Sequence, residues 1–304
     1  MSTPEEVLEL ATQRYQTALK NFGGSSTHSA VDEFLQASFL IGPLDQYKIL
    51  PPPCHRIAAD SSEREGKGGS GRAFLQLLVW HAIADSIQSR RFSRLPARVQ
   101  KHQLVQFSRM LQHEAVPDGW SSLESDIFLK DFGLASLRLY AAAAQLIDLR
   151  CGLARSILLR SGFRGLGKGL RMLMDCGGFQ PMLQIHTHTA YLDEFNEAGW
   201  EECYRTCADI YAANPGILGM FGGSWFYDPQ LREISPRLAY LMDTPCRAGA
   251  HLLLTDTEGD FVQDAISTSP SRRKLFETGE YKPCRYTLVW GKRRQTQWAI
   301  EHAL

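Results

Sequence analysis

The chain has 304 residues, of which 44% are hydrophobic and 22% are charged, a composition typical of globular proteins with a packed core. Its 33 basic and 33 acidic residues cancel, which excludes an overall charge that would attract nucleic acid or an anionic membrane. Seven cysteines spread along a long chain predict reduced thiols rather than a disulfide framework. The N-terminus lacks the pattern of a signal peptide and no apolar run is long enough to cross a bilayer, so we expect a soluble cytoplasmic protein. The sequence is silent on oligomeric state.

The first part of the chain has the apolar periodicity of helices. Between these helices, residues 50–72 are dense in proline, glycine, serine and charge, which predicts a long exposed loop. We therefore expect a helical N-terminal portion over residues 1–115, with a loop at 50–72. Its helices are expected over 4–22, 29–40, 73–90 and 97–113.

Residues 116–180 are an ambiguous connecting region, because "SLRLYAAAAQLIDLR" fits either a buried helix or two short strands. From residue 181 onward, strands alternate with helices, which predicts a mixed-sheet α/β domain over 181–304. The strands are expected over 181–188, 217–227, 250–256 and 286–290, with "TQWAI" near the C-terminus as a further candidate. The helices are expected over 190–213, 229–242 and 271–278.

The stretch "MLQIHTHTAYLDEF" carries the first candidate site. Alternation along a strand would place His186 and His188 on the same face, where both imidazoles can reach one metal ion. Asp193 or Glu194 would supply a carboxylate. Two histidines and one carboxylate suit non-haem iron, so an iron-dependent enzyme is one candidate function.

The same histidines fit other roles. Cys203 and Cys207, four residues apart on an expected helix, could complete a tetrahedral zinc site. Without a metal, His186 or His188 is a candidate general base. The simplest alternative is a strand end whose histidines hydrogen-bond to their neighbours, with both cysteines in the core.

A second candidate site lies in "FRGLGKGLRML", where Arg164, Gly167 and Gly169 have the spacing R-x-x-G-x-G. Successive backbone N–H groups in such a loop, together with the start of the next helix, suit a pyrophosphate. The motif resembles the acetyl-CoA loop of the GNAT acyltransferase superfamily, which lies between a strand and a helix. The resemblance implies a GNAT-like fold, acyl-CoA as cofactor, and "RSILLR" as the preceding strand.

The order of strands and helices from 217 to 290 also resembles the C-terminal half of that superfamily. "SRRKLFETGEY" is similar to its penultimate helix, which usually holds a tyrosine that can protonate the leaving thiolate. The nearest counterparts in this chain are Phe276 and Tyr281. The two resemblances place acyl-CoA in different segments, and both alternatives stay open.

"STSPSRRK" predicts an anion site. Ser269 is a candidate cap and Pro270 suits the first helical turn. Arg272 and Arg273 would then stand beside free backbone N–H groups and bind a phosphate or carboxylate. The alternative is an ordinary capped surface helix with solvated arginines.

"GGSWFYDP" predicts a substrate pocket formed by Trp225, Tyr227 and Asp228. Glycines permit close approach of the backbone, and aromatic rings commonly line ligand sites. The alternative is core packing, with Trp225 and Tyr227 on one strand face.

Together these patterns predict a small-molecule enzyme, most concretely an acyl-CoA-dependent N-acyltransferase with His186 or His188 as the base. The second hypothesis is a metal-dependent enzyme that holds iron or zinc on the histidine pair. The third is a non-catalytic binding protein whose helical portion contacts a partner.

Overall fold

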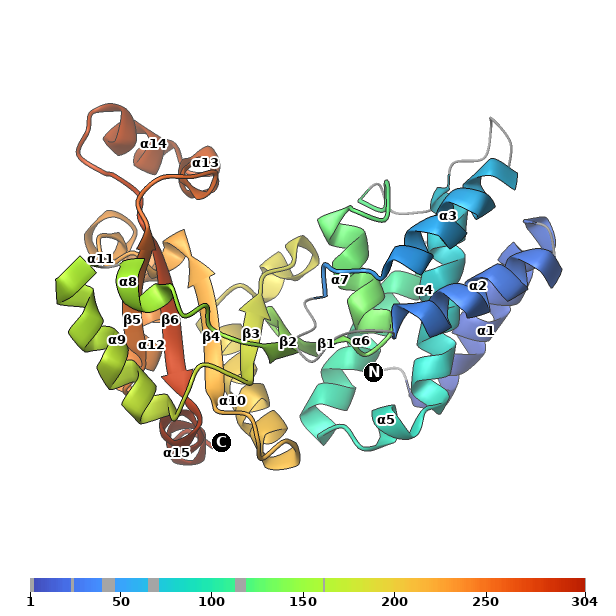
Figure 1. Cartoon of the computed structure of the whole chain (residues 1–304), viewed down its shortest axis with the longest axis horizontal. Helices are drawn as coiled ribbons and strands as arrows, with labels where there is room; N and C mark the ends of the chain where they lie inside the picture. The colour runs from blue at the N-terminus through green and yellow to red at the C-terminus, as the bar shows by residue number, and fades with distance from the viewer. Residues whose placement is uncertain are drawn as a thin grey trace. The chain divides into compact units, whose positions relative to one another are not determined.

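The computed structural model describes residues 3–22, 25–39, 47–64, 71–112, 119–160 and 162–303, without the side chains of 62–64, 159, 162–164, 190 and 191. The chain forms two compact units (Figure 1). The first is Met1–Leu149 with Thr187–Leu192, and the second is Arg150–His186 with Asp193–Leu304. The mixed α/β class expected from the sequence is confirmed. Among the described residues, no helix is long and apolar enough to span a membrane.

The first unit is built mainly of helices around α4, which is buried along most of its length. Phe34 of α2 joins α4 to α7, because its ring lies 6.1 Å from Phe74 and 5.7 Å from Phe132. The helices are α1 (Pro4–Asn21), α2 (Ser25–Ser38), α3 (Pro52–Arg64), α4 (Arg72–Gln88), α5 (Arg90–Ser93), α6 (Ala97–Gln112) and α7 (Asp126–Ala135).

The loop expected at 50–72 is wrong over most of its length, because α3 occupies Pro52–Arg64. Prolines in a first helical turn cost little, since the N–H that they lack would be unpaired there anyway. In α3, buried residues recur at helical spacing among polar residues, and this buried stripe holds the helix against its neighbours. The buried positions are Cys54, Ile57, Ala58 and Ser61. Residues 65–70 lie outside the described part of the chain.

The ambiguous "SLRLYAAAAQLIDLR" forms two strands, β1 (Leu139–Ala142) and β2 (Gln145–Cys151), paired antiparallel. A two-residue connection joins them, with Ala143 at φ 47°, a backbone region used by tight hairpin turns. Both faces of β1 and of most of β2 are buried. A strand buried on both faces shows no alternation, which is why its periodicity did not separate it from a buried helix.

In the second unit, strands follow one another in the spatial order β3, β4, β6, β5. β3 (Met182–His186) and β4 (Gly219–Ser224) are parallel, and β6 (Arg285–Gly291) runs antiparallel to both of its neighbours, β4 and β5 (His251–Asp256). The other elements of this unit are α8 (Ile157–Arg160), α9 (Gly162–Cys176), α10 (Glu197–Ala213), η2 (Trp225–Tyr227), α11 (Leu231–Ile234), η3 (Pro236–Leu238), α12 (Tyr240–Arg247), α13 (Phe261–Ser267), α14 (Pro270–Glu277) and α15 (Lys292–Glu301). The short helix η1 (Thr189–Glu194) begins in the first unit and ends in the second.

Helices cover both faces of this sheet (Figure 1). On one face, Phe221 and Val289 pack in a core with Met172 of α9. On the other face, the Trp290 ring lies 5.2 Å from Tyr204 of α10 and 5.5 Å from Trp298 of α15. The expectation of a strand at "TQWAI" is wrong, because this segment belongs to α15. Its Trp298 is buried against the sheet, and one buried face is enough to hold a short helix.

A buried amide joins α15 to α10 and β4. Gln295 is fully buried, accepts a hydrogen bond from the Tyr211 hydroxyl at 2.6 Å and donates to the Tyr204 carbonyl oxygen at 3.2 Å. Its Nε2 also lies 3.2 Å from Sδ of Met220. Because these groups are inside the protein, losing the amide leaves the Tyr211 hydroxyl without this acceptor.

Replacing Gln295 by alanine is expected to lower the free energy of unfolding by about 1–3 kcal/mol, the cost of leaving a buried polar group unsatisfied. Urea denaturation followed by circular dichroism measures this loss. The control is Gln297→Ala on the same helix, which removes only an exposed contact to Glu301 and should change stability by about 0.5 kcal/mol or less. Equal losses in both variants would contradict the assigned role of Gln295.

Candidate active site at the carboxyl ends of β3 and β4

The parallel pair β3–β4 is joined over only part of its length. Among the described residues, its ladder consists of Leu183 opposite Met220 and Gln184 opposite Phe221. Both strands continue further, β3 to His186 and β4 to Ser224, and β4 stays paired with β6 throughout. In open α/β sheets, ligands bind outside the carboxyl ends of parallel strands. The end of the ladder is therefore a candidate position for a ligand.

Glycines form this end of β4. A Cβ atom added to Gly222 would lie 2.6 Å from Cγ1 of Ile185 and 3.2 Å from the hydroxyl oxygen of Tyr227. Since Cβ contacts below 3.0 Å do not occur without a shift, a larger residue would displace Ile185. Glycine is therefore needed for the close approach of β4 to both side chains.

Tyr227 presents a buried phenol to this position. Its side chain is 1% exposed, and its hydroxyl makes no hydrogen bond within the described parts of the chain. Burial, followed by the nearby Cys203 thiol, raises the pKa of Tyr227 well above its ordinary value, so the phenol stays protonated. A buried hydroxyl without a partner costs about 1–3 kcal/mol. A ligand that accepts a hydrogen bond from the Tyr227 hydroxyl removes that cost.

His186 ends β3 on the opposite face of the sheet from Tyr227. Alternation along β3 places His186 on the same face as Met182, which packs in the core with α9. Tyr227 lies on the other face, where its ring is 6.4 Å from Trp200 of α10. The strand ends at His186, so His188 lies outside it. The premise that both histidines alternate on one strand is therefore wrong.

His188 belongs to the first unit, whereas His186 belongs to the second. His188 is 1% exposed, and its Nε2 lies 3.3 Å from Oδ1 of Asp131. Asp131 also accepts a hydrogen bond from Trp120 at 2.8 Å and pairs with Arg109. Burial alone would raise the pKa of Asp131, but the His188 hydrogen bond and the Arg109 charge outweigh it and lower that pKa. His188 is thus part of a buried polar cluster.

The other expected metal ligands belong to the second unit, whereas His188 belongs to the first. Asp193 and Glu194 are exposed at the end of η1. Cys203 and Cys207 are fully buried in α10, where burial raises the pKa of the Cys203 thiol well above its ordinary value. That shift opposes the thiolate that zinc binds. Among the described residues, the donor atoms close enough to hold a metal ion belong to a different cluster, in the first unit.

The stretch expected as a CoA loop is helical. α8 replaces the expected strand "RSILLR", and Arg164, Gly167 and Gly169 lie within α9. Only the first turn of a helix has free N–H groups, so those of Gly167 and Gly169 are engaged within the helix. The side chain of Arg164 lies outside the described part of the structure. A buried stripe explains why four glycines do not break this helix. The stripe consists of residues 165, 169, 172 and 176.

Replacing Gly167 by alanine is expected to raise the free energy of unfolding by about 0.5–1 kcal/mol, because alanine is the better helix former. The position is exposed, and an added Cβ meets nothing within 4 Å. Gly169→Ala is the matched comparison, since its Cβ would lie 2.5 Å from a methyl group of Leu158 and should lose this gain. Thermal unfolding measures both. A loss of stability in Gly167→Ala would restore the loop interpretation.

Helix α14 begins as the sequence predicts. Ser269 accepts a hydrogen bond from the backbone N–H of Arg272, and Pro270 occupies the first turn. The two arginines differ, however. Arg273 is exposed and donates to the carbonyl oxygen of Ser267 at 2.9 Å, whereas Arg272 points into the protein.

Arg272 is only 3% exposed, so the alternative of solvated arginines is wrong for this residue. Its guanidinium lies 4.8 Å from the centre of the Trp225 ring and donates to the Ala265 carbonyl oxygen at 2.6 Å. A further bond at 3.2 Å reaches the Ser235 hydroxyl. A cation–π contact and two acceptors offset the cost of burying this charge.

The three expected pocket residues have separate roles. Trp225 and Tyr227 belong to η2 rather than to a strand, so they do not share a strand face. Asp228 accepts hydrogen bonds from the backbone N–H groups of Cys284 at 2.9 Å and Gln230 at 3.1 Å, and burial raises its pKa. Through these hydrogen bonds, Asp228 holds the turn after β4 against the segment before β6. Of the three, Tyr227 faces the end of β4.

Comparison with known proteins leaves the family open. No protein-family model matches the chain, and no curated protein matches it in sequence. Among solved structures, the chain is similar to that of an acyltransferase in complex with decanoyl-CoA and teicoplanin. The two are 13% identical with a TM-score of 0.33, over 91% of this chain and 99% of the other. A likeness that weak shows neither the family nor the function of this chain.

Sequence analysis missed a histidine–carboxylate pair in the second unit. Nε2 of His251 lies 2.8 Å from Oδ2 of Asp175, although 76 positions separate them, and this hydrogen bond lowers the pKa of Asp175. A carboxylate that orients an imidazole is a common arrangement for a general base. However, His251 lies on β5, which β6 separates from β4. Two strand spacings, about 10 Å, therefore keep this pair away from the end of the β3–β4 ladder.

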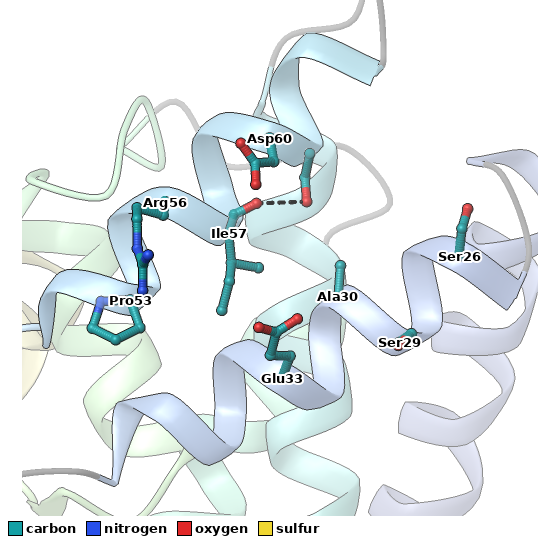
Figure 2. Close-up of a pocket in the computed structure, with 9 residues that line it drawn as sticks. Ser26, Ser29, Ala30, Glu33, Pro53, Arg56, Ile57 and Asp60 are labelled. Atoms are coloured by element: carbon teal, nitrogen blue, oxygen red, sulfur yellow. Dashed lines mark hydrogen bonds between the residues drawn. The ribbon is translucent and has the colours of Figure 1, made fainter.

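The first unit contains a pocket of about 410 Å³ between α2 and α3 (Figure 2). Glu33 of α2 and Ile57 of α3 point toward each other across it, and the Ser61 hydroxyl donates to the Ile57 carbonyl oxygen at 2.8 Å. The lining carries carboxylates, hydroxyls and one guanidinium, which suits a small polar ligand. The lining residues are Ser26, Ser29, Ala30, Glu33, Pro53, Arg56, Ile57, Asp60 and Ser61.

Proposed function

We propose that the second unit is an acyl-CoA-dependent N-acyltransferase whose thioester lies between the carboxyl ends of β3 and β4. The observation that carries the proposal is the early end of the β3–β4 ladder beside the buried, unpartnered hydroxyl of Tyr227. The backbone of Gly222 and Gly223 would lie close to the acyl carbonyl, because neither residue has a side chain of its own. Backbone N–H groups aimed at a developing oxyanion are an effective source of catalysis.

In the proposed reaction, one residue on each face of the sheet takes part in a proton transfer. The amine nitrogen attacks the thioester carbonyl carbon, the C–N bond forms and the C–S bond breaks. His186 accepts the proton that the amine loses and releases it to solvent. From the other face, the Tyr227 hydroxyl hydrogen-bonds to the departing sulfur and gives it a proton, which Tyr227 regains from solvent. A base and an acid on opposite sides of the thioester match the two proton transfers that the reaction needs.

An aromatic cluster beside Tyr227 supports an apolar acyl group. The rings of Phe195, Trp200 and Phe226 lie 5.6–5.7 Å from one another. Phe226 in turn lies 4.8 Å from Tyr227. Apolar walls with a few placed polar groups are typical of small-molecule sites, and such a wall would favour a thioester of a fatty acid over acetyl-CoA.

The test is thermal unfolding of the full chain with CoA and with acyl-CoA thioesters of increasing length. A ligand that binds only the folded state raises the Tm, and we expect this rise for the wild-type chain and for Gly216→Ala. We expect no rise for Gly222→Ala, whose Cβ would displace Ile185 and crowd the Tyr227 hydroxyl. Gly216 is the matched control because a Cβ there meets nothing within 4 Å.

Incubation with a panel of primary amines, followed by mass spectrometry, then tests turnover. The expected result is an amine heavier by one acyl group, with free CoA formed in equal amount. The proposal fails if acyl-CoA raises the Tm of neither chain, or if Gly222→Ala responds to acyl-CoA as the wild type does.

A further inference from the structure

Two helices of the first unit carry the same short pattern. The sequence "HSAVD" lies on α2 and "HAIAD" on α4, so each helix has a histidine followed four positions later by an aspartate. Residues four apart lie on the same face of a helix. The four side chains, which we call the α2–α4 cluster, are His28, Asp32, His81 and Asp85.

Packing of α2 on α4 brings these side chains together. Nε2 of His81 lies 2.9 Å from Oδ1 of Asp32, and Nε2 of His28 lies 3.5 Å from Oδ2 of the same carboxylate. One donor atom from each of these three residues lies within 4.8 Å of the others. Zinc binds nitrogen and oxygen at about 2.0–2.2 Å in a tetrahedron, which sets its ligand atoms about 3.3–3.6 Å apart. The observed separations require only small movements.

Asp85 can supply the fourth ligand. Its Oδ2 lies 3.8 Å from Nε2 of His81, and its side chain is 61% exposed and therefore free to turn inward. The side chains of His28 and Asp32 are 45% and 42% exposed, which gives an ion access from solvent. Histidine nitrogen and aspartate oxygen are both zinc ligands, and four protein ligands without an open position are typical of zinc sites that stabilise a fold.

Tyr15 of α1 orients one of the histidines. Its hydroxyl lies 2.6 Å from Nδ1 of His28, and its ring stacks on His81 at 4.5 Å. When the phenol oxygen accepts the proton on Nδ1, Nε2 of His28 is left unprotonated and directed at Asp32. Metal-bound histidines almost always donate their other N–H to such an outer partner.

We propose that the α2–α4 cluster binds one Zn²⁺ ion, which joins α2 to α4. The ion takes the place of the proton in the His81–Asp32 hydrogen bond, and it adds bonds between two helices that otherwise meet through that hydrogen bond and side-chain packing. The site is independent of the acyl-transfer chemistry proposed for the second unit.

The experiment is a zinc titration of the untagged full chain, purified, stripped with EDTA and dialysed. Competition against a chromophoric chelator should give one tight equivalent, and the Tm should rise with zinc. Mg²⁺, which prefers oxygen ligands, should produce neither effect. His28→Gln/His81→Gln should lose both, whereas His55→Gln should keep them. His55 is the matched control because it is also a surface histidine near a carboxylate, 3.6 Å from Glu124.

Tyr15→Phe keeps all four ligands and tests the geometry separately. Loss of an outer-shell partner typically weakens metal affinity 10–100-fold, and we expect a loss of about that size with the stoichiometry unchanged. The proposal is overturned if the wild-type chain binds no zinc at micromolar concentration. It is equally overturned if His28→Gln/His81→Gln binds zinc as tightly as His55→Gln does.

Discussion

Replacing Asp131 by asparagine is expected to lower the free energy of unfolding of the first unit by about 3–5 kcal/mol, the usual cost of breaking a buried ion pair. Asp131 is 1% exposed and contacts Arg109, Trp120 and His188. The amide keeps the shape of the carboxylate but removes the charge that balances Arg109. Urea denaturation at pH 7, followed by tryptophan fluorescence, measures the loss.

Asp126→Asn is the matched control, because it changes the same residue type on the same helix. Asp126 pairs with Lys48 and Lys130, but its side chain is 46% exposed. Solvent screens such pairs, so the expected loss is about 1 kcal/mol or less. If both variants lose the same stability, burial of Asp131 is not what gives its contacts their strength.

The stability that Asp131 contributes is also expected to depend on pH. The pKa of Asp131 is lowered in the folded chain, so the folded state takes up this proton less readily than the unfolded state, whose aspartates titrate near about 3.9. The contribution of Asp131 is therefore complete above that pH and is lost as the pH falls through the folded pKa. The difference in stability between wild type and Asp131→Asn should shrink on acidification below about pH 4. A constant difference down to the acid transition would contradict this assignment.

Replacing Tyr227 by phenylalanine is expected to reduce kcat for acyl transfer by about 100-fold, the lower range for loss of a positioned proton donor. The ring and its packing against Trp200 remain, so the KM for acyl-CoA should change little. Stability should be unchanged or slightly higher, because a buried hydroxyl without a partner is removed. Steady-state rates at saturating amine, with the Tm measured in parallel, test all three statements.

Tyr204→Phe separates catalysis from packing. Tyr204 is also 1% exposed, its pKa is also raised by burial, and its hydroxyl also makes no hydrogen bond within the described chain. It lies on α10 beneath Trp290, rather than beside Gly222. We expect wild-type kcat from this variant. Equal losses of kcat in the two variants, or none in either, would remove Tyr227 from the mechanism.

Local patterns in the sequence predicted several elements well. Residues 4–22 and 97–113 were expected as helices, and α1 and α6 occupy almost the same positions. Strands expected at 250–256 and 286–290 correspond to β5 and β6. α1 and α6 each bury residues at helical spacing, and Thr3 caps the start of α1. β5 and β6 are short apolar runs of strand-forming residues. The information that specifies them is contained in a few consecutive residues.

Elements with a mixed local signal were missed. The prolines of α3 and the glycines of α9 led to the prediction of loops in their place. The β-branched and aromatic residues of "TQWAI" suggested a strand where α15 forms. In each case a buried stripe holds the helix against its neighbours, and tertiary packing outweighs intrinsic propensity. Such a stripe can be recognised in the sequence only after the structure shows which face of the helix is buried.

The sequence by itself determined which residue types are present and which neighbours share a helix face, as in the two His-x-x-x-Asp patterns. Only the tertiary structure decided that His81 meets Asp32 across 49 positions, that His188 lies against Asp131, and that Tyr227 faces Gly222. Turns, caps and helical periods depend on interactions within about four residues. Contacts between distant segments depend on how whole helices and strands pack, which no local pattern encodes.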